Sequence, residues 1–254
     1  MIDIHCHILP GVDDGPVTTE ESLLMAREAV KEGIKTIIAT PHHRNNKYEN
    51  KKVDILKNVD KLNRLLRKEN IPLEILPGQE NRIFGEILED YQKGEILTLT
   101  NSNFLFIEFP TASVPRYAER LLYDIQTEGL TPIIVHPERN KELLENPSIL
   151  YNLVNNGALT QVTAASVVGY FGKSIKKFAY QLIEHNLTHF VASDAHNTIN
   201  RTFKLNEAFD IIEKDFGTDY VYLFAENSEN VITNNIIIKE IPYQIKRKKF
   251  LGVF

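Results

Sequence analysis

Seven short apolar segments, separated by longer stretches with helical periodicity, constrain most strongly what this chain folds into. The segments are rich in Ile, Val, Leu, Phe and Thr, and such short runs are typical of strands buried on both faces of a parallel sheet. They are Ile2–His5, Thr36–Thr40, Leu73–Leu76, Phe104–Phe109, Pro132–Val135, Leu159–Val162 and Thr188–Ala192.

The stretches between these segments carry helix signals. Thr18 stands three residues before Glu21, which is the spacing of a capping box, and Gly33 suits the end of that helix. Seven strands, most of them followed by a helix, predict an α/β fold of parallel β/α units. A closed (β/α) barrel and an open doubly wound sheet both fit this count. The other candidate helices are Lys51–Asn70, Pro115–Glu128, Ser148–Asn156, Ser174–Asn186 and Lys204–Phe216.

Length and charge limit the domain organisation and the partners. The 254 residues, 43% of them hydrophobic, fit one globular domain or at most two small ones. We expect a single domain over residues 1–240 and a basic, then apolar, C-terminal tail at 241–254. The net charge of −5 disfavours nucleic acid as a partner.

Several features favour a cytoplasmic protein. No apolar run approaches the roughly 18 residues that span a bilayer, so no transmembrane segment is expected. The N-terminus lacks the basic and apolar pattern of a signal peptide. Cys6 is the only cysteine, which excludes an internal disulfide and a zinc site made of thiolates.

Residues of metal-ligand type stand at or just after the end of six of the seven segments. Because the carboxyl ends of all strands in a parallel barrel open on one face, such residues can converge there, and this distribution favours the barrel. Only the sixth segment, ending Gln161-Val162-Thr163, lacks such a group. The residues are His5 and His7, His42 and His43, Glu80, Glu108, His136, and Asp194 and His196.

The spacing within the first and last pairs supports convergence. His5 and His7 are two residues apart, so both rings point to the same side of a strand, and Asp194 and His196 share this spacing. The first and last strands are neighbours in a closed barrel, so the two pairs are expected to meet. An isolated His-x-His pattern is mostly incidental, and a buried Glu108 also fits a partnership with an arginine. The combined pattern is what favours a metal centre.

The expected ligand set suits two or three metal ions. It holds four or five histidines and three or four carboxylates, counting Asp13 or Asp14 in the first loop. Imidazole and carboxylate together suit Mn²⁺, Fe²⁺, Zn²⁺ or Co²⁺. Closely spaced ions of this kind generate hydroxide near neutral pH and clamp phosphoryl oxygens, so hydrolysis of a phosphate ester is expected.

Other chemistries fit the sequence less well. A cysteine-dependent phosphatase needs an arginine six residues after its nucleophile, but Val12 stands there, and Cys6 is expected to point away from His5 and His7 into the core. No phosphate-binding glycine loop and no G-x-S-x-G motif is present. His185 and His189 are interpreted as structural, and His43 has no assigned role.

The chain resembles bacterial tyrosine-protein phosphatases of the polymerase and histidinol phosphatase (PHP) superfamily, of the capsule and exopolysaccharide (CpsB/CapC) type. The resemblance covers essentially the whole chain, with its motifs in the expected order. The segments that carry it are Met1–Gly15, Thr40–His42, Pro77–Glu80, Ile107–Pro110, His136–Asn140 and Ser193–Asn197.

The resemblance implies a distorted seven-stranded, TIM-like (β/α) barrel with a trinuclear site. Manganese is the implied metal, with iron, zinc, cobalt or magnesium as alternatives. It implies one ion on His5, His7, Glu80 and Asp194, a second on Glu80, Glu108 and His136, and a third on Asp14, His42 and His196.

The implied reaction is hydrolysis of phosphotyrosine on a protein partner, typically a membrane-associated bacterial tyrosine kinase that regulates capsule or exopolysaccharide synthesis. Arg139 and Arg201 would stabilise the charge that develops on the phosphoryl group, and Arg44 and Lys47 would add positive charge near the mouth of the site. The basic tail is a candidate for peripheral membrane contact. Alternatives are a small-molecule phosphatase such as histidinol phosphatase, a DNA exonuclease, and a non-catalytic metal-binding kinase adaptor.

Overall fold

The computed structural model describes residues 1–246. Within them, parallel strands form two sheets, with the orders β1-β2-β4 and β3-β5-β6-β7-β8-β9. This confirms the α/β fold with parallel sheets. The strands are β1 (Ile2–Cys6), β2 (Thr36–Ala39), β3 (His42–His43), β4 (Glu74–Pro77), β5 (Glu80–Arg82), β6 (Phe104–Glu108), β7 (Thr131–Val135), β8 (Leu159–Thr163) and β9 (Phe190–Ala192).

Every segment expected to be a strand overlaps one, but the second and third are each followed closely by another short strand. Pro41 separates β2 from β3, where its missing N–H interrupts the ladder. Gly78 lies between β4 and β5, and a Cβ there would lie 2.6 Å from Ile38 Cγ2. These bends carry the chain from one sheet into the other, with His42 in register with Glu80.

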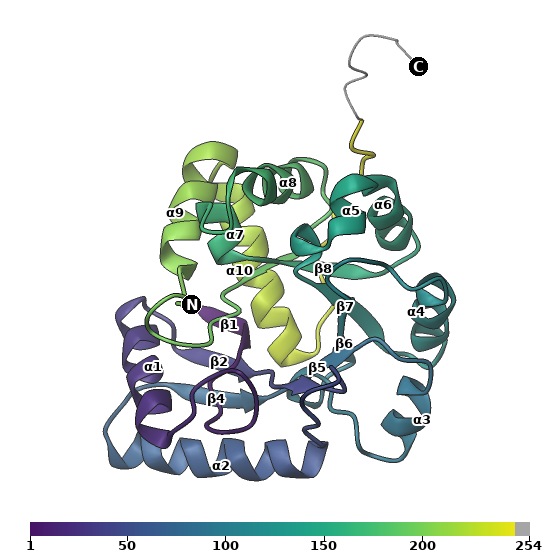
Figure 1. The fold of residues 1–254 in the computed structure, drawn as a ribbon. Coiled ribbons are helices and arrows are strands. Elements are labelled where there is room, and N and C mark those ends of the chain that lie inside the picture. Colours follow the sequence, from purple (N-terminus) through teal and green to yellow (C-terminus); the bar gives the residue numbers. More distant parts are fainter. Residues whose placement is uncertain (247–254) are drawn as a thin grey trace.

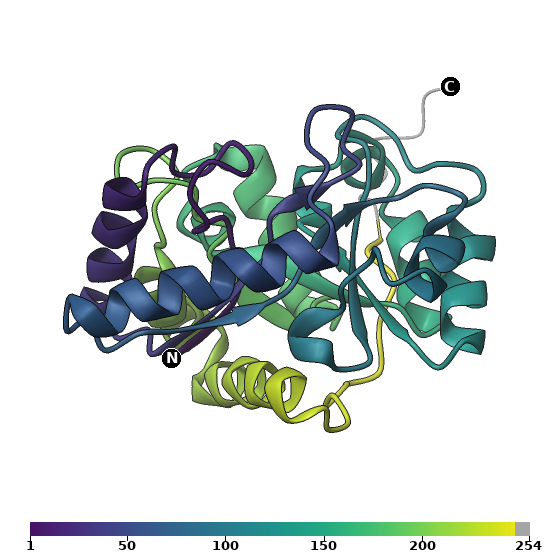
Figure 2. The ribbon, with the colours of Figure 1, turned by 90° about the horizontal axis from the view of Figure 1, so that it is seen from below.

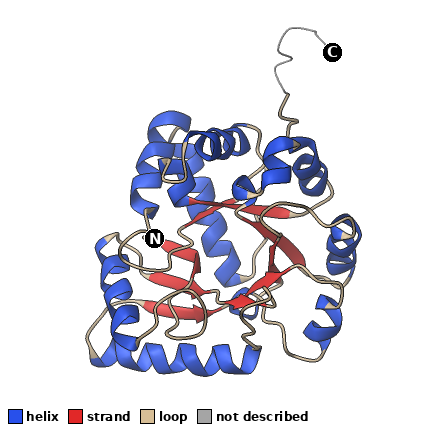
Figure 3. Ribbon diagram, viewed as in Figure 1, coloured by secondary structure: helices blue, strands red, loops and turns tan. Residues whose placement is uncertain are grey.

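The strands are arranged around a common centre (Figure 3). Besides the two bends, the sheets also meet where the end of β1 lies beside the chain just after β9. There the His7 N–H donates to the Ala195 carbonyl, and the Asp194 N–H donates to the His5 carbonyl, both at 2.9 Å. Only an isolated bridge, between Cys6 and Ala195, is formed there. The expected closed barrel of seven strands is therefore not confirmed, because the described strands form two separate ladders.

Helices surround the strands (Figure 1). Four of them, α3, α5, α7 and α10, were not expected from the sequence. The longest of these, α10, packs against β1, β9 and the turn at Leu99–Asn101. Figure 2 shows it at one end of the strands. The helices are α1 (Thr19–Lys31), α2 (Lys52–Lys68), α3 (Ile87–Gln92), α4 (Ala118–Thr127), α5 (Lys141–Glu145), α6 (Pro147–Asn155), α7 (Ala164–Val168), α8 (Lys173–Glu184), α9 (Leu205–Phe216) and α10 (Thr218–Thr233).

Two apolar clusters hold these layers together. The larger one joins the sheets to the surrounding helices, and Cys6 belongs to it. The smaller one lies among the strands, where Ile4, Phe106 and Phe190 meet Val231 of α10. The strand ends opposite α10 are thereby left for polar residues.

The chain after α10 packs back on the domain. Asn186 donates its side-chain N–H to the Ile241 carbonyl, and the Tyr243 N–H donates to the His185 carbonyl at 2.9 Å. The first part of the expected tail at 241–254 thus contacts the end of α8, whereas 247–254 lie outside the described residues. In the described part of the chain, no helix combines the length and apolar character needed to cross a bilayer.

His189 has the structural role expected of it. It lies just before β9, and its Nδ1 accepts a hydrogen bond from the Thr160 N–H at 3.1 Å, which requires that nitrogen to be unprotonated. Burial, assisted by the positive charge of Lys239, lowers the pKa of His189 to about 3. The ring is therefore neutral in the folded protein at neutral pH.

This depressed pKa predicts a pH-dependent loss of stability. An unfolded histidine has a pKa of about 6.5, so the unfolded state binds more protons between pH 6.5 and pH 3, and stability falls as the pH is lowered through that window. His189→Asn keeps a hydrogen-bond acceptor but does not titrate. Between pH 7 and pH 4, urea unfolding should show the wild type losing on the order of 3 kcal/mol more than the variant. Parallel pH profiles would contradict this account.

Candidate metal centre

Glu80 lies at the centre of a buried cluster at the carboxyl ends of the strands. Its Oε2 is 3.2 Å from His7 Nε2 and 3.5 Å from His5 Nε2, both on or after β1. The same oxygen is 2.8 Å from Nδ1 of His42, on β3. Its other oxygen, Oε1, is 2.8 Å from Nε2 of His136, which follows β7. One carboxylate thus contacts four imidazoles.

The structure brings all nine expected ligands into one cluster. Asp194 Oδ1 lies 3.5 Å from His5 Nε2, and Asp14 Oδ1 lies 3.3 Å from His196 Nε2. Ligand atoms lie within 4.8 Å of one another in three groups. His7, His42 and Glu80 each belong to two of these groups, so the groups differ from the three ligand sets that the resemblance implies. The groups are His5, His7 and Glu80; His42, Glu80 and Glu108; and His7, Asp14, His42 and His196.

Unpaired buried atoms show that the cluster fits metal ions. Glu80 Oε2 and His42 Nδ1 are close, yet neither makes a hydrogen bond of acceptable geometry among the described residues, and the same holds for Glu108 Oε2 and His196 Nε2. A buried charge without a partner costs several kcal/mol. Cations among these atoms would satisfy them, and imidazole with carboxylate is a donor set for Mn²⁺, Fe²⁺, Zn²⁺ or Co²⁺.

The electrostatics of the protein alone support the same interpretation. Burial raises the pKa of Glu108 to about 7, and the negative charge of Glu80 adds to this effect. Burial of His42 favours its neutral ring, but the charge of Glu80 and the hydrogen-bonding interactions with Asp14 and Glu80 together outweigh burial and raise the pKa to about 10. Without a metal ion, the cluster must therefore be neutralised by protons, which bound cations would displace.

Three further residues, none of them expected to act here in this way, support the ligands from behind. Gln161 of β8, the segment that lacked a metal-binding type, places Oε1 2.8 Å from His5 Nδ1. Asp13, one of two candidates in the first loop, contacts His7 Nδ1 at 2.6 Å. Arg82 of β5 pairs with Glu108 at 3.2 Å. Such partners orient ligand rings and carboxylates. One sequence feature could have indicated the role of Gln161: it lies near the carboxyl end of a strand, as most of the expected ligands do.

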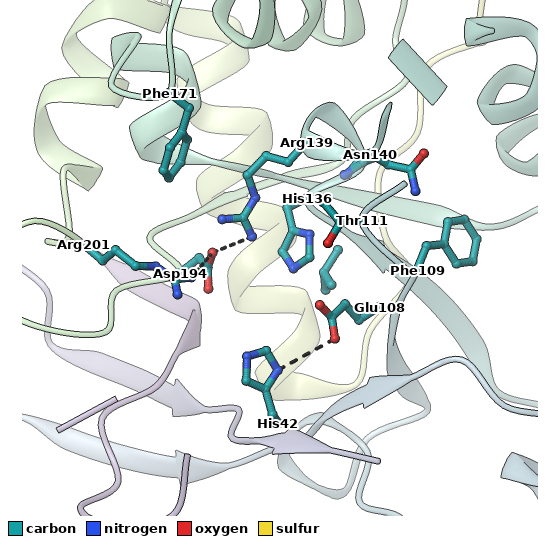
Figure 4. Close-up of a pocket in the computed structure, with 12 residues that line it drawn as sticks. His42, Glu108, Phe109, Thr111, His136, Arg139, Asn140, Phe171, Asp194 and Arg201 are labelled. Carbon is teal, nitrogen blue, oxygen red and sulfur yellow. Dashed lines mark hydrogen bonds and ion pairs between the residues drawn. The ribbon is translucent and has the colours of Figure 1, made fainter. Parts of the chain in front are cut away.

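Both expected arginines reach the pocket above the cluster (Figure 4). Arg139 Nη2 lies 2.7 Å from Asp194 Oδ2, and Arg201 Nη2 lies 3.1 Å from the same oxygen. The pocket has a volume of about 380 Å³, and both arginines line it. Arg44 pairs instead with Asp90 and lines a different cavity, together with Lys47.

The remaining candidates lie away from the cluster. Cys6 is fully buried in the larger apolar cluster, and burial, with Asp3 nearby, raises the pKa of its thiol well above the usual value. It packs as expected and lacks the environment of a thiolate nucleophile. His43 is buried next to His42 on β3 but belongs to none of the three ligand groups.

A parallel α/β scaffold with five histidines and four carboxylates gathered at its strand ends, beneath a pocket with two arginines, defines a metal-dependent hydrolase. The chain belongs to the CpsB/CapC family of capsular polysaccharide synthesis proteins, whose model matches residues 1–233. This confirms the resemblance that the motifs carry.

Relatives extend this comparison. The chain is 51% identical to the tyrosine-protein phosphatase YwqE of Bacillus subtilis and 42% identical to the putative tyrosine-protein phosphatase CapC of Staphylococcus aureus, with all of both chains covered in each case. It is 35% identical to the tyrosine-protein phosphatase CpsB of Streptococcus pneumoniae, over 93% of this chain and all of the relative.

Solved structures agree. A structure from work on YwqE of B. subtilis and CpsB of S. pneumoniae, described as unique metal-dependent tyrosine phosphatases, matches with a TM-score of 0.95 at 51% identity, over 97% of this chain and 100% of that one. A β-aspartyl dipeptidase from Fervidobacterium islandicum matches with a TM-score of 0.54 at 13% identity, over 91% of this chain and 72% of that one, which shows a shared fold alone.

The central position of Glu80 predicts that its removal empties the cluster. Glu80→Ala should lose most bound metal and retain its fold, because the ligands lie beyond the apolar clusters. Metal content by mass spectrometry and circular dichroism of the purified protein measure both effects. Glu74→Ala, an exposed glutamate on β4, serves as the control and should keep the metal. Wild-type metal content in Glu80→Ala would contradict the assignment of this carboxylate.

Proposed function

We propose that the protein is a metal-dependent protein-tyrosine phosphatase that hydrolyses phosphotyrosine on a partner protein. The observation that carries this proposal is the buried histidine and carboxylate cluster beneath a pocket with Arg139 and Arg201. The tyrosine-protein phosphatase relatives, aligned along the whole chain, support the choice of substrate. The partner is a membrane-associated bacterial tyrosine kinase of capsule or exopolysaccharide synthesis, and the reaction takes place in the cytoplasm.

Up to three divalent ions occupy the cluster in this proposal. Manganese is the preferred metal, with iron, zinc, cobalt or magnesium as alternatives. When bound, such ions supply hydroxide near neutral pH and neutralise charge on phosphoryl oxygens. The residues that would hold them are His5, His7, Asp14, His42, Glu80, Glu108, His136, Asp194 and His196.

The arginines bind the phosphoryl group. Arg139 and Arg201 approach one oxygen of Asp194 from two sides, which holds both guanidinium groups at the pocket wall. A guanidinium offers a planar fork that bonds two oxygens at once. Charge spreads over three oxygens during phosphoryl transfer, so two forks stabilise charge that the cluster below does not reach.

The proposal also includes the arrangement of the strands, the bounds of the domain and the C-terminal tail. We infer that the seven segments act as the bent strands of a distorted barrel, since two of them continue through Pro41 and Gly78 into a second strand. Residues 1–240 form the catalytic domain. The basic residues of the tail at 241–254, which are Lys246, Arg247, Lys248 and Lys249, are a candidate for peripheral membrane contact in this proposal.

Turnover of a phosphotyrosine peptide tests this function. With Mn²⁺, the purified protein should release phosphate from the peptide faster than from histidinol phosphate, and a chelator should abolish the reaction until Mn²⁺ is added back. Cys6→Ser should keep most of the activity, because its thiol is buried in the core. Phosphate release by colorimetric assay measures each rate. Preference for histidinol phosphate would replace the proposal with a small-molecule phosphatase, and no turnover at all would favour an adaptor.

Lysine substitution tests the arginine pair. Arg139→Lys and Arg201→Lys keep a positive charge but lose the fork, so each should keep its metal and lose about tenfold in kcat/KM, or about 1.4 kcal/mol of transition-state stabilisation. Arg120→Lys, on the exposed face of α4, is the matched control and should behave as wild type. Wild-type turnover in both pocket variants, with metal in place, would remove the arginines from the mechanism.

A further inference from the structure

Two aromatic residues stand in a tight turn at the rim of the pocket. The turn Gly169-Tyr170-Phe171-Gly172 connects α7 to α8, and the Gly172 N–H donates to the Gly169 carbonyl at 3.0 Å. Both glycines have positive φ, +100° and +95°, a conformation that strains other residues. The backbone therefore fixes where the two rings project.

The Phe171 ring faces the pocket. Its centroid lies 5.4 Å from the Arg139 guanidinium carbon and 5.4 Å from the centroid of Tyr170, which packs nearly at right angles to it. Phe171 lines the pocket above Arg139 (Figure 4), and Phe109 lines it from the end of β6. Tyr170 is 53% exposed and supports Phe171 from the solvent side.

The floor and the wall of the pocket differ in chemistry. The floor belongs to the polar cluster, in which Glu80 is fully buried and Asp194 is 3% exposed. The apolar lining includes Phe109, Pro137 and Phe171, beside the polar Thr111 and Asn140. A phosphomonoester that reaches the floor can therefore place the group next to its phosphate against the aromatic side chain of Phe171.

We propose that Phe171 binds the phenyl ring of the substrate and thereby favours aryl over alkyl phosphomonoesters, an inference that rests on the proposed phosphatase function and names its specificity-determining residue. Arg139 lies over the Phe171 ring and Tyr170 packs against it nearly at right angles, and the part of the ring that lines the pocket remains available to a second ring. Aromatic pairs prefer such offset or edge-to-face contacts. A seryl or threonyl phosphate has no aromatic ring that could contact Phe171.

Non-hydrolysable ligands test the contact apart from turnover. Benzylphosphonate and methylphosphonate carry the same head group and differ by a ring. Calorimetry on the Mn²⁺-loaded wild type should show benzylphosphonate binding about tenfold more tightly. In Phe171→Ala this ratio should fall close to one, with methylphosphonate affinity and metal content unchanged. Phe171→Leu should recover little of the ratio, and Phe171→Tyr most of it.

Kinetics give a second readout. For a phosphotyrosine peptide, Phe171→Ala should raise KM about tenfold with little change in kcat, because the ring contact is the same before and during the reaction. Tyr123→Ala, an aromatic residue 61% exposed on α4, should change neither constant.

The outcomes separate two failures. If Phe171→Ala weakens both phosphonates equally, the ring acts only by positioning Arg139, and the proposal is overturned; an unchanged ratio in Phe171→Ala overturns it as well. If the wild type turns over no phosphotyrosine, the proposed function fails. The phosphonate ratio in wild type and Phe171→Ala then still decides whether Phe171 binds the ring.

Discussion

The balance between buried carboxylates and buried imidazoles around Glu80 is the constraint on which the rest of this structure depends. Four carboxylates and five histidines share a space in which several ligand atoms have no hydrogen bond among the described residues. Such an arrangement costs free energy unless cations or protons compensate it. The elevated pKa values of Glu108 and His42 show how strongly the protein alone would draw protons to this point.

The fold meets this constraint by bending strands. Pro41 and Gly78 let two chain segments pass from one sheet to the other, and His42 and Glu80 then pair in register just beyond the bends. The apolar residues among the strands, closed by Val231 of α10, lie beneath the cluster and exclude water from that side. Most of the ligands therefore stand on a strand or within a few residues of its end, which holds their geometry in place, whereas Asp14 lies in the loop between β1 and α1.

The pocket has three layers of different chemistry. The cluster at the floor fits metal ions, Arg139 and Arg201 lie above it, and Phe171 stands at the rim. In the proposed function, the arginines bind phosphoryl oxygens and Phe171 contacts the group that carries the phosphate. Asp194 connects the first two layers, since it lies near His5 and also pairs with Arg139. Arg139 connects the second to the third through the face of Phe171. A substitution in one layer is therefore expected to alter the geometry of the next. For this reason, ligand binding, metal content and turnover must be measured separately.

The sequence by itself determined the order of strands and the residue types at their ends, because both depend on local periodicity and on where an apolar segment stops. It also placed His5 and His7 on one side of a strand and Cys6 on the other. Only the tertiary structure decided that the ladders remain two sheets, that α10 packs under β1 and β9, and that Asp13 lies behind His7. The contacts of Gln161 with His5, of Arg82 with Glu108 and of Phe171 with Arg139 likewise depend on the tertiary structure, because these residues lie far apart along the chain. Local patterns cannot specify such contacts, because they depend on how separate elements pack together in three dimensions.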